Sequence, residues 1–181
     1  MKRIVSACMV VAVVTFLVGG CSTAPKTAEG KVELTSKVQT AKESAVKSDP
    51  GLKKFFDEAA GYAIFPTVGK GAVGVGGAFG RGTLYDGGQL SGYCTLTQAS
   101  IGLALGGQAY TELIFFETQA TLDRFKTGNF AFAAQASAVA LKSGASANAK
   151  YTDGVAVFTM SEAVLMYEAS IGGQKFNYQP I

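Results

Sequence analysis

The chain contains no histidine, and this absence removes several kinds of chemistry before any pattern is considered. Ser-His-Asp and Cys-His nucleophilic sites, HExxH zinc sites and a histidine general base all need the imidazole ring. Carboxylate, lysine and Ser-Lys chemistry stay possible. Because Asp57 and Glu58 are neighbours on an expected helix, and Glu112 and Glu117 are isolated, no carboxylate pair is visible. We expect no catalytic residue, no metal site and no cofactor.

Charged residues are scarce too, at 16% of 181 residues, with a formal net charge of +3. This charge is too small to indicate a nucleic-acid partner. Hydrophobic residues make up 48% of the chain, which is enough for a packed core and excludes a disordered tail. The length suits one domain.

The first twenty residues are typical of an export signal. Lys2 and Arg3 precede residues 4–18, which are almost wholly apolar. A helix of fifteen residues, at about 1.5 Å per residue, is shorter than the hydrocarbon core of a bilayer, about 30 Å thick. The pattern therefore predicts a secretory signal peptide over residues 1–20 rather than a permanent membrane span.

The sequence Leu-Val-Gly-Gly-Cys at residues 17–21 resembles a bacterial lipobox. This resemblance implies cleavage before Cys21 and acyl chains on that residue. Since two or more chains anchor a protein stably, we expect a lipid-anchored protein of the cell envelope. Ser22, by resemblance to enterobacterial sorting, favours the outer membrane. The alternative is an ordinary signal peptide followed by a chance cysteine.

After the anchor we expect a polar tether over residues 21–30 and a domain over residues 31–181. Residues 31–47 form an expected helix whose apolar stripe is Leu34, Val38, Ala41 and Ala45. Asp49 is the expected N-cap of a second helix with Pro50 in its first turn. That helix is expected to end at Gly61.

From residue 62 the apolar pattern changes from a helical period to a period of two, which favours strands. Residues 69–92 include ten glycines, and even positions 72–82 hold only alanine and glycine. A strand with one bare face is typical of a bend or a close backbone approach. Expected strands are 62–65, ending at Pro66, then 95–105, 110–117, 130–141, 155–160, 164–171 and 175–178.

Two further local signals complete the expected fold. Asp86-Gly87-Gly88 predicts a hairpin turn, and Thr118 is the expected cap of a short helix over residues 119–127. Cys94, the last thiol of the mature chain, is expected in the core. The fold class is α+β: an antiparallel, curled or closed Gly-rich sheet, with N-terminal helices and one short helix packed on one side.

At residues 60–66 the sequence Ala-Gly-Tyr-Ala-Ile-Phe-Pro resembles the SYLF-domain family of lipid-binding proteins. The Gly-rich strand over 69–82, the segments 101–108 and 113–116, and the closing strands over 168–178 also resemble that family. The likeness covers roughly residues 35–178. It implies a non-catalytic domain that binds phospholipids.

Six residues are candidates for lipid contact. The basic side chains of Lys53, Lys54, Lys70 and Arg81 are expected to meet phosphate heads. Phe55 and Phe56 are expected to meet acyl chains or to shape the core beside them. The alternative for the helix places its phenylalanines in the core and its lysines in solvent. The alternative for the whole protein is a structural or interaction lipoprotein that docks another envelope protein, with only its acyl anchor in the membrane.

Overall fold

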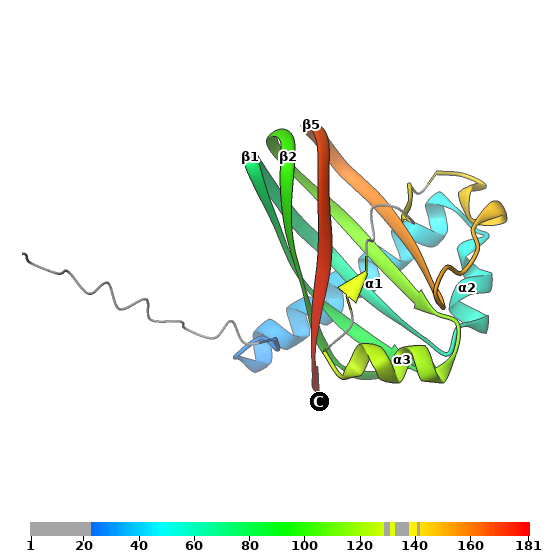
Figure 1. The fold of residues 1–181 in the computed structure, drawn as a ribbon. Helices are drawn as coiled ribbons and strands as arrows, with labels where there is room; N and C mark the ends of the chain where they lie inside the picture. Colours follow the sequence, from blue (N-terminus) through cyan, green and yellow to red (C-terminus); the bar gives the residue numbers. More distant parts are fainter. Residues whose placement is uncertain (1–22, 129–130, 133–137, 141) are drawn as a thin grey trace, which may run out of the picture.

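The computed structural model describes residues 23–128, 131–132, 138–140 and 142–181 (Figure 1). Three helices, five strands and a short 3-10 helix follow one another in these ranges. Their bounds are α1 (Ala28–Ser48), α2 (Leu52–Glu58), β1 (Gly61–Asp86), β2 (Gln89–Phe116), α3 (Gln119–Lys126), β3 (Ala131–Phe132), β4 (Ala138–Ala140), η1 (Ala145–Asn148) and β5 (Val155–Pro180). Among the described residues, no helix is both long and apolar enough to cross a bilayer.

The strands form one sheet in the order β1-β2-β5-β3, with β4 also paired to β5. The pairs β1–β2, β2–β5 and β3–β5 are antiparallel, whereas β4 runs parallel to β5. The sheet is curled but not closed (Figure 1). Helices α1 and α2 pack on its outer face, whereas α3 packs against the core between its two halves. The expected α+β class with a curled, mainly antiparallel sheet is therefore confirmed, and closure is not observed.

Each of the three long strands bends over and returns, so the sheet has two halves that face each other (Figure 1). The two halves of β1 nearly touch near its ends: a Cβ on Gly82 would lie 2.3 Å from the carbonyl oxygen of Ile64. A Cβ on Gly61 would lie 2.4 Å from the carbonyl oxygen of Tyr85. Bare positions on this strand thus permit a close backbone approach, as the glycine pattern predicted.

The expected strand breaks were wrong. Residues 95–105 and 110–116 belong to the single strand β2, which ends before Glu117, and residues 155–178 lie within β5. Glycines bend these strands without ending their hydrogen-bonded pairing. Pro66 does not end β1 either: it lies where the β1–β2 register shifts, between Phe65 and Val68. A proline is tolerated there because β1 is an edge strand, paired to β2 only among the described residues.

The hairpin between β1 and β2 was predicted correctly. Asp86 pairs with Gln89, and the two residues between them, Gly87 and Gly88, have φ angles of 54° and 80°. Two successive positive φ angles are the geometry that glycine adopts without a steric penalty.

The first helix starts earlier than expected. Its N-cap is Thr27, whose side chain accepts a hydrogen bond from Gly30 N at 3.1 Å. Ala24 is only 4% exposed, and its N–H donates to Gln179 Oε1 at 3.2 Å. Residues 24–30 are therefore part of the folded body rather than a flexible tether. The predicted stripe is confirmed: the buried residues of α1 are Leu34, Val38, Ala41 and Ala45.

The starts of the other two helices agree only in part with the sequence predictions. Thr118 caps α3 as predicted, through its side chain and Thr121 N. The expected helix start at Asp49 was wrong, since α2 begins at Leu52 and Asp49 binds backbone N–H groups of Gly51 and Ser146 instead. Of the strand expected over residues 130–141, residues 131–132 and 138–140 are strands; positions 130, 133–137 and 141 lie outside the described residues.

The bent sheet has one layer of hydrophobic core on each face. The inner cluster, between the two halves, includes Phe65, Leu96, Phe116 and Phe176 together with the buried Cys94. The outer cluster joins the sheet to α1 and α2 through side chains such as Val38, Phe55 and Phe115. Helix α3 adds Leu122 and Phe125 to the inner cluster.

Gly82→Ala should destabilise the protein strongly. Its Cβ would meet backbone atoms of Ile64, which cannot move without separating the halves of β1. We expect a loss of at least about 2 kcal/mol in the free energy of unfolding, measured by urea denaturation. Gly69→Ala is the matched control, because nothing lies within 4 Å of a Cβ there. Equal losses of stability in the two variants would contradict the close approach of the two halves of β1.

Candidate functional site

The six residues predicted to contact lipid lie in three separate parts of the structure. Lys53, Lys54, Phe55 and Phe56 belong to α2, Lys70 lies on the inner face of β1, and Arg81 lies on its outer face. The structure therefore does not bring them together into one site.

On α2 the lysines face solvent beside carboxylates. Lys53 Nζ lies 2.6 Å from Asp57, and Lys54 Nζ lies 3.9 Å from Glu58. Phe55 is buried in the outer core, where its ring centroid is 5.0 Å from that of Phe158. Burial of Phe55 with solvated lysines on either side corresponds to the alternative in which α2 has a structural role.

Phe56 is half-buried at the junction of α2 with α1 and β1. Its ring stands edge-on to Tyr62, with centroids 4.9 Å apart, and Lys42 Nζ lies 4.5 Å from its centroid. Lys42 also donates a hydrogen bond to the Tyr62 hydroxyl at 3.0 Å. This cation over two aromatic rings fixes α1 against α2 and the sheet.

A groove of about 660 Å³ lies between α2 and the loop that contains η1. Its aromatic wall is Phe55 and Tyr151, with ring centroids 5.6 Å apart, and Lys54 and Glu58 also line it. Burial, then the carboxylates of Glu117 and Glu58, raise the pKa of Tyr151 to about 12, so its hydroxyl stays protonated at neutral pH. Asp49 is the second acidic residue of the lining, so the groove offers aromatic rings beside one lysine and two carboxyl groups.

The groove lies near the C-terminal end of α1, and a different set of residues surrounds the N-terminal end of this helix. Lys31 Nζ lies 5.4 Å from the ring centroid of Tyr93, and Tyr93 pairs with Gln179 of β5. The N–H of Ile181 donates to the carbonyl of Ser91. The beginning of α1, the start of β2 and the end of β5 therefore meet here, and we name this region the N-terminal end of the domain.

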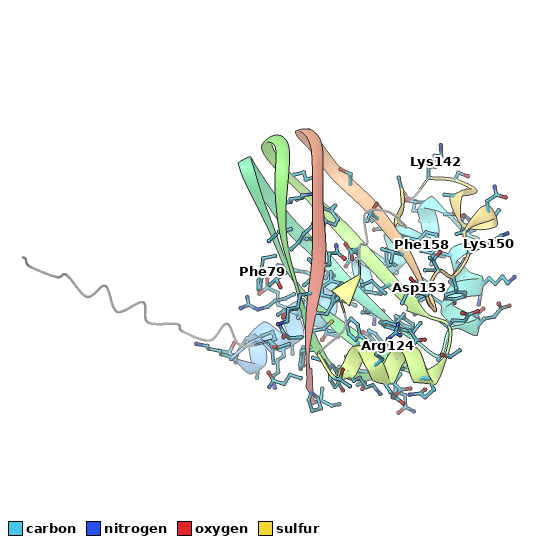
Figure 2. All side chains as sticks on the ribbon, viewed as in Figure 1. Phe79, Arg124, Lys142, Lys150, Asp153 and Phe158 are labelled. Atoms are coloured by element: carbon cyan, nitrogen blue, oxygen red, sulfur yellow. The ribbon has the colours of Figure 1, made fainter. Side chains whose placement is uncertain are left out.

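Exposed apolar side chains lie at this end and on the sheet beside it. Among the described residues, the large hydrophobic side chains that remain exposed are Val32, Phe79 and Ile181. Phe79 projects from the outer face of β1 with the Arg81 guanidinium 5.2 Å from its ring centroid. In Figure 2 Phe79 lies on the other side of the molecule from Lys142 and Lys150, which flank η1.

The interior between the two halves holds polar side chains that the sequence pattern did not single out. Glu112 is 1% exposed, and its Oε2 accepts a hydrogen bond from Gln174 Nε2 at 2.9 Å. Gln98, directly opposite Gln174 in the β2–β5 register, is 6% exposed. We call Gln98, Glu112 and Gln174 the interior polar cluster. Lys70 is buried on the same inner face of the sheet, beyond Val68.

Sequence reasoning treated Glu112 as isolated, although a signal for its burial exists. It alternates with Tyr110 and Ile114, which belong to the inner core. A period of two therefore puts the carboxyl on the buried face. Burial raises the pKa of Glu112 to about 7, while the hydrogen bond from Gln174 opposes this shift.

Comparison with known proteins gives the class of this chain. Residues 97–175 match the family model Ysc84, described as Las17-binding protein actin regulator. Beta cell expansion factor A of Aeromonas veronii is 31% identical over 162 residues, which cover 84% of this chain and 59% of that protein. The chain belongs to the SYLF family, as its AIFP and Gly-rich segments predicted. It spans less than two thirds of the length of that relative.

Glu112 should make stability depend on pH. The pKa of Glu112 is raised in the folded protein, so between pH 4.5 and about pH 7 the folded protein keeps a proton that the unfolded chain releases. The contribution of Glu112 to the free energy of unfolding is therefore fully present below pH 4.5. It is lost as the pH rises through about 7, by up to about 3 kcal/mol.

Glu112→Gln should flatten this profile. Relative to the unsubstituted protein, the variant should gain stability between pH 5 and pH 8 in urea unfolding experiments. Glu117→Gln, at an exposed position just after β2, is the control and should leave the profile unchanged. Parallel profiles for the Glu112 variant and the unsubstituted protein would contradict the buried, protonated carboxyl.

Proposed function

We propose that this protein is a lipid-anchored protein of the bacterial envelope, sorted to the outer membrane, whose SYLF domain binds phospholipid without catalysis. One observation carries the proposal: Ala24, the second of the described residues, is buried and hydrogen-bonded to Gln179. If acyl chains occupy Cys21, only two residues separate them from this point. Three residue steps span at most about 10 Å, so the N-terminal end would be held at the bilayer surface.

The chemistry of that end supports contact with anionic phospholipid. Val32 and Ile181 are exposed there, and Phe79 is exposed on the adjoining outer face of the sheet. Arg81 lies beside Phe79, and Lys31, next to Val32 in α1, lies over the Tyr93 ring. Lys175 shares the sheet face of Phe79, since Thr97 pairs with both residues. Lys26 directly precedes Thr27, the N-cap of α1. Apolar side chains that enter the headgroup layer and cations that meet phosphate are the two contributions to binding at a membrane surface.

The lysines of α2 are less well placed for this contact. Helix α1 separates them from the N-terminal end by its own length, about 30 Å for 21 residues. Lys53 and Lys54 also lie beside Asp57 and Glu58, which reduces the positive potential around them. We therefore propose that Arg81, among the six predicted residues, meets phosphate heads.

The second candidate function is docking of an envelope protein. The groove beside α2 favours it, because an aromatic wall with one lysine and two carboxyl groups suits a peptide segment as well as a lipid. It lies at the end of α1 away from the N-terminal end of the domain, where a partner could approach an anchored domain.

The anchor itself can be tested by mass spectrometry of the protein purified from membranes. We expect cleavage before Cys21 and a mass increase from three acyl chains on that residue. Cys21→Ser should leave the protein unacylated and move it to the soluble fraction, whereas Cys94→Ser, at the buried thiol, should leave the anchor unchanged. A mature protein with an unmodified Cys21 would refute the proposal.

Lipid contact can be tested by flotation of the domain from Thr23 onward with vesicles of phosphatidylglycerol or phosphatidylcholine. We expect flotation with the anionic lipid only. Arg81→Glu combined with Lys175→Glu should abolish it, because each basic contact contributes only about 1 kcal/mol and several must act together.

The matched control reverses two charges at the other end, Lys53→Glu with Lys54→Glu. We expect this variant to float like the unsubstituted domain. Loss of flotation in the α2 variant alone would place the lipid site on α2. No flotation of the unsubstituted domain with either lipid would favour the interaction protein.

A further inference from the structure

The interior polar cluster leaves several hydrogen-bonding atoms without a partner. Glu112 Oε1, Gln174 Oε1 and both amide atoms of Gln98 form no hydrogen bond. All three side chains are more than nine-tenths buried, at 1%, 3% and 6% exposure. Buried polar atoms are nearly always satisfied in folded proteins, so four such atoms in one small region need a physical explanation.

The three side chains come from both halves of the sheet. Gln98 and Gln174 are register partners in one half of the sheet, whereas Glu112 comes from the other half, where it pairs with Thr159. The hydrogen bond from Gln174 to Glu112 spans the space between the halves. Inner-core side chains such as Leu96 and Phe176 lie on one side of the cluster along the same strands. The interior polar cluster therefore borders the inner hydrophobic core.

The chemistry of the unpartnered atoms selects the kind of group that fits. Two are amide oxygens that accept hydrogen bonds, and one is an amide nitrogen with two N–H donors. The fourth, Glu112 Oε1, donates when the carboxyl carries its proton and accepts when it is ionised. A metal ion or an ammonium group would leave the Gln98 amide nitrogen unsatisfied, and a phosphate would face two amide oxygens that can only accept. Hydroxyl groups both donate and accept, so adjacent hydroxyls can serve all four atoms.

We propose that the interior polar cluster binds a small polyol group, with adjacent hydroxyls held between Glu112, Gln98 and Gln174. The hydroxyls donate to the two glutamine oxygens, and one of them accepts from Gln98 Nε2. A hydroxyl also pairs with Glu112 Oε1, accepting from it when the carboxyl is protonated and donating to it when the carboxyl is ionised. The polyol can be a free molecule such as glycerol or the glycerol headgroup of a phospholipid. This site is separate from the surface proposed to lie on the membrane.

The two sources can be distinguished by NMR of the ¹⁵N-labelled domain from Thr23 onward. The probes are glycerol, dihexanoyl phosphatidylglycerol and dihexanoyl phosphatidylcholine, whose headgroup has no hydroxyl. We expect saturable shifts of the Gln98 and Gln174 side-chain amides with one or both hydroxyl-bearing probes and none with phosphatidylcholine. A shift with phosphatidylglycerol alone identifies the lipid as the source.

Gln98→Met gives a second, independent readout. It removes two unpartnered atoms at similar volume, so the variant should unfold at higher urea concentration than the unsubstituted protein and lose the saturable shift of Gln174. Gln119→Met, at an exposed position of α3, is the control and should keep that shift.

Two outcomes would overturn the proposal. One is the absence of saturable shifts with every probe, together with a Gln98→Met variant that is less stable, which means that the cluster holds water only. The other is an equal response of Gln119 and Gln98 amides to glycerol, which means that the probe acts as a general cosolvent.

Discussion

The close crossing of the two halves of β1 is the constraint on which the rest of the structure depends. Gly82 lies against the backbone of Ile64, and Gly61 lies against that of Tyr85, at distances where any side chain would collide. Because the halves of β1 meet in this way, the other two long strands are also folded over. The curl of the sheet, and therefore its interior, follows from glycines that have no side chain to keep the backbones apart.

The curl divides the molecule into regions with different chemistry. Inside, apolar rings such as Phe65 and Phe176 fill one part of the interior and the polar cluster fills the next. Outside, α1 covers the region where the halves of β1 cross, through Tyr62 and Tyr85, whose rings stack 4.8 Å apart. The length of α1 keeps the N-terminal end of the domain apart from the groove beside α2. One small domain thus has chemically different regions at its two ends.

Local patterns in the sequence predicted the elements whose conformation is set by near neighbours. The apolar stripe of α1, the Thr118 cap and the Gly87-Gly88 turn were all predicted correctly, because each depends on contacts within a few residues. The strand ends were not, since a glycine that bends a paired strand has the same sequence signature as one that ends it. The prediction that Pro66 ends a strand was wrong for a similar reason. Its effect depends on whether a neighbouring strand needs the N–H that proline lacks.

The candidate sites show the same division. The chain by itself determined the helical positions of Lys53 and Phe55, the bare face of β1 and the family to which the protein belongs. Only the tertiary structure decided that Lys70 is buried, that Arg81 is exposed beside Phe79, and that Glu112 meets Gln174. Those relations join residues up to 62 positions apart, and no local period encodes which half of a folded sheet will face the other.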